Sequence, residues 1–278
     1  MKLIDLDGQF NRRVAKYLAK HAGERTEEEW EDAIAAAYRK FADTPMEEIG
    51  TTPRLYFAGM TNGQLVETLK EYLLQDVTVP DILLEELEKR GAVPETLALL
   101  RETDESLVLY AVHFIGADPK AASRYAQMLA EDAYDEHVKD EVAEKLAEMA
   151  DAVTDELLGL LGGPARAYAL ELLSRTARRD ERVLRALVDA FLAADEADLP
   201  QYAGYLAAYG DERALPALQR RIAEDVGFAA YRELKFAIEA LGGSYDEARD
   251  FSQDAAYKKV AEAAEAGAET DIFSPQKK

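Results

Sequence analysis

The amino-acid sequence predicts an all-α protein whose short helices form antiparallel pairs stacked along one axis. Apolar residues follow the 3.6-residue spacing of an amphipathic helix along nearly all of the 278 residues. Good helix formers (Ala, Leu, Glu and Arg) dominate the composition. Glycines that end a predicted helix recur 46, 48 and 32 residues apart, each interval about the length of one helix pair; these are Gly116, Gly162, Gly210 and Gly242.

Residues 1–50 are expected to form an N-terminal helical cap of two helices. The first spans residues 12–21. The second begins after Thr26, because Thr26 and Glu29 are spaced as a capping box, and it carries one apolar stripe. That stripe consists of Trp30, Ile34, Ala37, Tyr38 and Phe41.

Helices and turns alternate after this cap. Asp104 is the expected cap of a helix that is apolar nearly all round and must therefore lie between neighbours. The one short β-branched run is residues 75–80, which end in a proline. Asp180 is expected to cap a later helix, and residues 199–209 to form the helix that ends at Gly210.

Two segments of the chain resemble each other. Residues 113–132 parallel residues 206–225 with one inserted residue, and both segments end in Ala-Glu-Asp. A helix pair cannot bury its own apolar faces, so neighbouring pairs must share a continuous core. We therefore expect a stack over residues 51–266, closed by a last helix from residue 246 to about residue 266, and a flexible tail over residues 267–278.

Residues 209–218 read Tyr-Gly-Asp-Glu-Arg-Ala-Leu-Pro-Ala-Leu. This stretch resembles a HEAT-like repeat of the phycobilisome-lyase type, in which Gly-Asp-x-Arg-Ala-Leu-Pro-x-Leu joins the two helices of a pair. The resemblance extends more loosely over residues 100–265, with repeats of unequal length. It implies a right-handed α-solenoid, a superhelix whose second helices line a concave face. It implies no single activity, because members scaffold proteins, assist chromophore attachment, hydroxylate a lysine derivative through an iron site or excise alkylated DNA bases.

The chain is strongly acidic and lacks cysteine: 33 Lys and Arg oppose 55 Asp and Glu, which gives a net charge of −22. Such a field repels phosphate backbones and anionic membranes, so we expect neither a nucleic-acid nor a membrane partner. The absence of Cys excludes disulfides, thiolate metal sites and Cys nucleophiles. The chain has no signal-peptide pattern and no run near the ~18 apolar residues of a membrane span, so we expect a cytoplasmic location.

Histidine is scarce, and its positions do not favour a metal site. The three His residues are His21, His113 and His137, whereas the iron-dependent relatives need several His-Glu pairs. His137 and Glu141 are spaced to share a metal, but acidic residues are so dense that chance explains the spacing. No phosphate loop, nucleophile elbow or dinucleotide fingerprint occurs. We expect no metal, no cofactor and no catalytic residue, and we interpret His113 as a satisfied or groove-lining side chain.

Charge is distributed unevenly along the chain. Residues 131–156 hold eleven acids and two lysines, whereas residues 164–185 hold six arginines and three acids. If the arginine-bearing helices face inward, they form a basic groove that receives an acidic peptide or a phosphate group. The alternative is that these arginines pair with neighbouring acids such as Glu181 and Glu224.

The candidate binding residues follow from this pattern. Tyrosine accompanies arginine in the same region, and the two residue types together commonly anchor binding surfaces. Tyr202, Tyr205 and Tyr209 are also spaced as an ordinary packing stripe. The candidates are Arg175, Arg178, Arg182, Arg185, Tyr205, Arg213 and Arg220.

These features favour a non-catalytic scaffold that binds a protein or peptide partner on the concave face of the solenoid. The alternative is an enzyme or accessory lyase on the same scaffold, for chromophore attachment or alkylated-base excision. Base excision needs a basic concave face, which the acidic total argues against. The sequence names neither the partner nor the oligomeric state.

Overall fold

The computed structural model describes residues 3–21, 23–24 and 26–269. Every regular element in these ranges is an α-helix or a 3₁₀-helix, apart from an isolated antiparallel bridge between Met46 and Thr51. The predicted all-α fold is therefore confirmed. None of the helices in this described part is both long and apolar enough to cross a membrane.

The chain divides into two compact units, and each is considered on its own. Unit 1 comprises Met1–Arg124 and Asp132–Lys145, and unit 2 comprises Tyr125–Glu131 and Leu146–Lys278, as far as these ranges are described. Two helices, α8 (Ala122–Ala130) and α9 (Glu136–Glu148), carry residues of both units.

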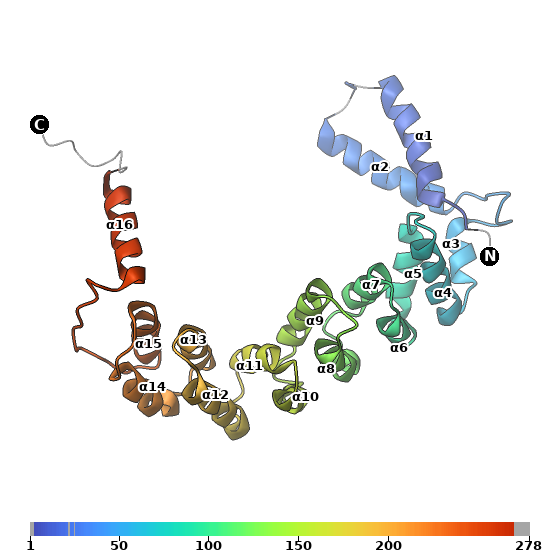
Figure 1. The fold of residues 1–278 in the computed structure, drawn as a ribbon. Helices are drawn as coiled ribbons and strands as arrows, with labels where there is room; N and C mark the ends of the chain where they lie inside the picture. Colours follow the sequence, from blue (N-terminus) through green and yellow to red (C-terminus); the bar gives the residue numbers. More distant parts are fainter. Residues whose placement is uncertain (1–2, 22, 25, 270–278) are drawn as a thin grey trace, which may run out of the picture. The chain divides into compact units, whose positions relative to one another are not determined.

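Unit 1 begins with two long helices and continues with shorter ones (Figure 1). Its elements are α1 (Leu6–His21), α2 (Glu27–Ala42), α3 (Pro53–Ala58), α4 (Asn62–Leu74), α5 (Asp81–Arg90), α6 (Val93–Thr96), η1 (Leu97–Arg101) and α7 (Glu105–Ile115). α1 contacts α2, and α2 contacts α3. α5 packs against α3 and α4, while α4 also contacts α6 and α7.

The starts of the first two helices are set by local side-chain caps. α1 begins at Leu6, earlier than the sequence predicts, because the Asp5 carboxylate accepts a hydrogen bond from the Gly8 amide at 2.8 Å. The predicted capping box of α2 is confirmed. The Thr26 hydroxyl accepts from the Glu29 amide at 3.3 Å, and the Glu29 carboxylate accepts from the Thr26 amide at 2.9 Å.

A buried polar contact joins one end of α1 to one end of α2. The Tyr38 hydroxyl donates to the Asp7 carboxylate at 2.7 Å. The Phe10 ring packs edge-on against Tyr38 at 4.9 Å and tilted against Phe41 at 5.5 Å. Burial raises the pKa of Asp7; the Tyr38 hydrogen bond opposes this shift and the Asp81 carboxylate adds to it. The two helices therefore form a tight junction at this end.

Unit 2 contains helix pairs in two layers (Figure 1). Its elements are α10 (Thr154–Gly159), η3 (Leu160–Gly162), α11 (Arg166–Ser174), α12 (Glu181–Ala193), α13 (Leu199–Tyr209), η4 (Glu212–Ala214), α14 (Leu215–Ile222), α15 (Phe228–Ala240) and α16 (Ala255–Glu269). α10 pairs with α11, α12 with α13, and α14 with α15. Because α13 also contacts α11 and α15, the second helices α11, α13 and α15 form one layer, and the first helices α10, α12 and α14 form the other.

The apolar core of unit 2 is shared between successive pairs. Phe191 of α12, Leu206 of α13 and Leu234 of α15 are each at most 1% exposed. α13 meets its own partner α12 and also the second helices of the two adjoining pairs. Its apolar residues are therefore covered from both sides, and no single pair buries its own surface.

The two similar segments of the sequence share one local structure. α7 ends at Gly116 with φ 59°, and α13 ends at Gly210 with φ 71°, a backbone region that favours glycine. An aspartate then caps a short 3₁₀-helix in each segment: Asp118 precedes η2 (Pro119–Ala121), and Asp211 precedes η4. The similarity in sequence therefore corresponds to a repeated helix-turn-helix connection.

The predicted stop at residues 162–163 is confirmed, because η3 ends at Gly162 with Gly163 as its cap, but Gly163 does not take the left-handed backbone expected there. α10 ends at Gly159 and continues as the 3₁₀-helix η3, after which Gly163 takes an extended φ of −123°. Gly163 precedes Pro164, and a residue before proline is pushed away from helical backbone values toward extended ones. The extended conformation of Gly163 at the end of η3 therefore follows from Pro164.

The last helix begins at Ala255 and not at residue 246 as the sequence predicts. The preceding residues are held to neighbouring helices instead. The Arg249 guanidinium donates to the backbone carbonyls of Glu224, at 2.6 Å, and Ile222. These tertiary hydrogen bonds satisfy groups at the end of α14, and they hold this stretch in a non-helical path.

The expected flexible tail, residues 267–278, falls in two parts. α16 continues through Glu269, so the first three of these residues are helical. Residues 270–278 lie outside the described residues.

Candidate functional site

The seven candidate binding residues are spread over unit 2. Three belong to the first-helix layer, one to η4 just before α14, one to the second-helix layer, and two to the loop that joins α11 to α12. In that order they are Arg182, Arg185 and Arg220; Arg213; Tyr205; and Arg175 and Arg178. The structure therefore does not gather all seven on one surface.

Arg182 and Arg185 border the same hollow, which lies between η3 and α12 and has a volume of about 490 Å³. Leu158, Leu161 and Ala186 line it with half-buried apolar surface. We call this site the arginine hollow. Its lining combines apolar side chains with guanidinium groups, and this combination suits a peptide that carries both apolar and acidic residues.

Arg182 is held in place by two carboxylates. Asp180 caps α12 by accepting from the Arg182 amide at 2.8 Å, and the same carboxylate accepts from Arg182 Nη2 at 2.6 Å. Arg182 Nη1 donates to Asp155 at 2.8 Å. Hydrogen bonds from the side chain and backbone of Arg182 lower the pKa of Asp180 to about 2. Arg182 therefore helps to fix the start of α12 in the absence of any ligand.

We call this arrangement, in which an arginine binds both the capping aspartate and an acid of the preceding helix pair, a clamp. The same clamp recurs 31 residues later. Asp211 accepts from the Arg213 amide at 3.0 Å and from Arg213 Nη2 at 2.7 Å, and Arg213 Nη1 donates to Glu181 at 2.6 Å. In both cases the arginine folds back on the capping aspartate and also reaches an acid near the start of the preceding first-layer helix. The tripeptide Asp-Glu-Arg recurs at residues 180–182 and 211–213, and this repeat is the sequence signal from which the clamp could be predicted.

Ion pairing accounts for several of the candidate arginines, as the alternative interpretation expects. Besides the two clamps, Arg175 Nη2 pairs with Glu171 at 2.5 Å. The Arg178 amide donates to Asp151 at 2.9 Å. Among the described residues, no ion pair involves the guanidinium of Arg178, Arg185 or Arg220.

Two of the three arginines that line the hollow have no ion pair in the described part of the chain. Arg166, from the start of α11, lines it as a third guanidinium, and the sequence analysis did not single this residue out. Glu181 is paired with Arg213. In the described part of the chain, the lining therefore has two exposed arginines without an ion pair, Arg166 and Arg185. It has one carboxylate without an ion pair, Asp189. Counted over the lining alone, three arginines oppose two acids, Glu181 and Asp189.

Tyr205 lies on the second-helix layer and away from this hollow. Its hydroxyl accepts from Gln201 Nε2 at 2.7 Å, and its ring packs edge-on against Tyr202 at 5.8 Å. Tyr209 is 1% exposed; its hydroxyl donates to the Asp180 carbonyl at 3.1 Å and accepts from the Asp180 amide at 2.9 Å. Tyr209 thus fixes the start of α12 from within the core.

His113 is exposed on α7 and has two partners. Its Nδ1 lies 2.9 Å from the Leu109 carbonyl, and its Nε2 lies 3.5 Å from Glu141. Glu141, considered above as a possible partner of His137, therefore lies against a different histidine. No cluster of three or more His, Cys, Asp or Glu residues that could hold a metal ion occurs in the ranges that the structure describes.

Comparison with known proteins gives no match to a protein-family model or to a curated protein.

Proposed function

We propose that this chain is a non-catalytic protein-binding scaffold with a HEAT-like α-solenoid architecture, and that its arginine hollow binds an acidic peptide segment of a partner. The sequence assigned binding to a concave face lined by second helices. We instead propose a binding site on the first-helix layer, because Arg182 and Arg185 lie there.

The repeated clamp supports the solenoid architecture. Arg182 reaches Asp155 from the preceding pair, and Arg213 reaches Glu181 in the same way. A third contact links neighbouring pairs at a similar sequence separation: the amide of Gly227, just before α15, donates to the Glu196 carboxylate at 2.7 Å. Contacts made over 27, 32 and 31 residues link each pair to the next at nearly constant spacing, as expected when pairs stack on nearest neighbours.

The observation that carries the peptide proposal is the pair of unpaired guanidinium groups, Arg166 and Arg185, beside apolar surface. Each can bind a carboxylate with two parallel hydrogen bonds. The partner we infer is an acidic peptide, because a flexible chain can place carboxylates at both arginines and an apolar side chain between them.

The experiment is a fluorescence-anisotropy titration of the full chain with a labelled ten-residue peptide that has Glu at every second position and Leu or Ala between. A matched peptide with Gln for Glu is the control. At about 0.15 M salt the Debye length is ~8 Å, so the repulsion from distant acids is screened while contact pairs persist. We expect saturable binding of the Glu peptide and at least about tenfold weaker binding of the Gln peptide. Equal binding of the two peptides would contradict the proposal.

A further inference from the structure

α1 and α2 diverge from their tight junction and leave apolar side chains uncovered between them. The buried residues of α1 are Leu6, Asp7 and Phe10, and those of α2 are Phe41 and Ala42, all at the junction end. Toward the other end of the two helices, no described residue is buried. The helices therefore form a groove that is closed at one end by the junction.

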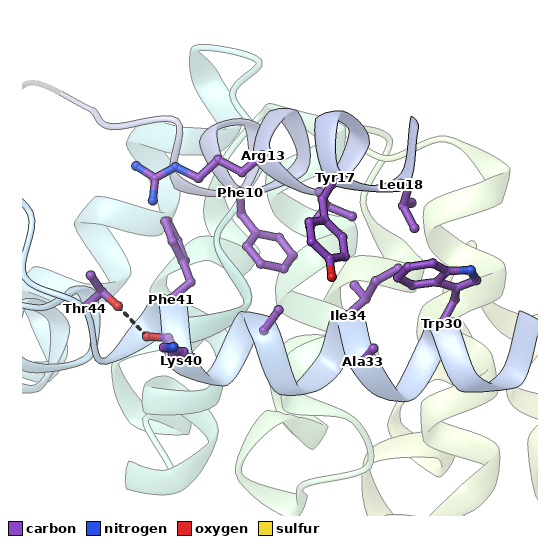
Figure 2. A pocket seen from close by; sticks show the side chains of 12 residues that line it. Phe10, Arg13, Tyr17, Leu18, Trp30, Ala33, Ile34, Lys40, Phe41 and Thr44 are labelled. Atoms are coloured by element: carbon purple, nitrogen blue, oxygen red, sulfur yellow. Dashed lines mark hydrogen bonds between the residues drawn. The ribbon is translucent and has the colours of Figure 1, made fainter. Parts of the chain in front are cut away.

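This N-terminal groove contains a hollow of about 380 Å³. Figure 2 shows Tyr17 and Leu18 of α1 and Trp30 and Ile34 of α2 lining it from the two sides. The rings of Tyr17 and Trp30 meet edge-on at 6.0 Å, yet Tyr17 stays 53% exposed. Exposed aromatic surface of this kind, gathered in a concave site, is typical of a docking surface.

The charged residues of α1 and of the hollow's lining are mostly basic, unlike the protein as a whole. Residues 8–22 contain Arg12, Arg13, Lys16 and Lys20 and no acidic residue, although the chain as a whole carries −22. The two charged residues that line the hollow, Arg13 and Lys40, are both basic. The Arg13 guanidinium lies 5.6 Å from the centre of the Phe41 ring. α2 also carries five acids, none of which lines the hollow: Glu27, Glu28, Glu29, Glu31 and Asp32.

We propose that the N-terminal groove docks an acidic amphipathic helix of a protein partner. Its apolar residues would lie between α1 and α2, and its carboxylates would face Arg13, Lys16 and Lys40. Helix-in-groove recognition needs an apolar trough and complementary charge beside it; the hollow supplies the first with its apolar lining and the second with Arg13 and Lys40. α1 has 16 residues, about 24 Å of helix, which suits a partner helix of three to four turns.

A protein partner fits better than a membrane surface. A membrane-binding helix presents one convex apolar face to lipid, whereas these apolar residues face one another across a hollow. The groove belongs to unit 1 and the arginine hollow to unit 2, so the proposed docking site and the proposed function can be tested independently.

The test uses Trp30, which is the one tryptophan of the chain and lines the groove. The full chain is titrated with a Trp-free 16-residue peptide that has Leu at helical i, i+3, i+4 and i+7 spacing and Glu elsewhere. We expect a saturable blue shift of Trp30 emission and reduced quenching by acrylamide. A peptide of the same composition with a permuted, stripe-free order should bind at least tenfold more weakly.

Two pairs of variants locate the binding. Arg13→Glu with Lys40→Glu should weaken binding at least tenfold, and Arg101→Glu with Lys120→Glu, an equal charge change on exposed residues outside the groove, should not. Tyr17→Ser should also weaken it, whereas Leu55→Ser, at a 62% exposed leucine elsewhere in unit 1, should not. Circular-dichroism melts check that all variants are folded.

Several results would overturn the proposal. They are equal binding of the permuted peptide, equal loss in the control variants, and a Trp30 shift caused by phosphatidylserine vesicles but not by the peptide. Self-association of the chain that Tyr17→Ser abolishes would identify the occupant as a second copy, and would also overturn it.

Discussion

Replacing Phe191 with Ala is expected to lower the free energy of unfolding of unit 2 by about 3–5 kcal/mol. Phe191 is completely buried on α12, and α12 contacts both α11 and α13. The truncation removes the transfer free energy of a whole ring and leaves a cavity that fixed helices fill only in part. Thermal or urea unfolding followed by circular dichroism measures the change.

Leu192 provides a matched control on the same helix. It is the next residue, yet it is 54% exposed, so Leu192→Ala should change stability by no more than about 0.5 kcal/mol. In a stack coupled through nearest neighbours, Phe191→Ala should also reduce hydrogen-exchange protection in α11–α13 more than in α3–α5. Equal loss of protection in both regions would argue against this coupling.

Reversing the charge of both free arginines of the hollow should weaken binding of the acidic peptide at least tenfold. In the variant with Arg166→Glu and Arg185→Glu, two attractive contacts become two repulsive ones. Exposed ion pairs are each worth about 0.2–1 kcal/mol, and reversal counts each contact about twice, so the expected loss is about 0.8–4 kcal/mol, whose midpoint exceeds the ~1.4 kcal/mol that corresponds to a factor of ten. The anisotropy titration with the Glu peptide measures this directly.

The control for this variant carries the same change in net charge. Arg178→Glu with Arg220→Glu alters two other candidate arginines that do not line the hollow. We expect the control to bind the peptide within about twofold of the unaltered chain at ~0.15 M salt, where distant charges are screened. If the control loses as much affinity as the hollow variant, long-range repulsion and not the hollow governs binding.

Local features of the fold could be predicted because their causes are close in sequence. Thr26, Asp104 and Asp180 cap their helices as expected, since each hydroxyl or carboxylate acts on an amide two or three residues away. The helix over residues 199–209 has the predicted ends, because Gly210 supplies the left-handed stop.

Features that depend on distant partners could not be predicted in the same way. The segment after Gly243 has helix-forming composition, but Arg249 bonds to carbonyls at the end of α14, more than twenty residues earlier. The layer that carries each arginine depends on how successive pairs pack, and spacing alone does not reveal it. The apolar stripe with Trp30 and Ile34 indicated a packed face, and only the three-dimensional arrangement shows that it borders an open groove.

The most direct test of the proposed peptide site is to see which arginines respond to the peptide. The measurement is the NMR spectrum of the arginine Nε–Hε groups of the ¹⁵N-labelled chain, titrated with the Glu peptide. We expect Arg166 and Arg185 to shift saturably and together, while Arg220 does not move. Equal small shifts across all arginines, or shifts confined to arginines outside the hollow, would contradict the proposed site.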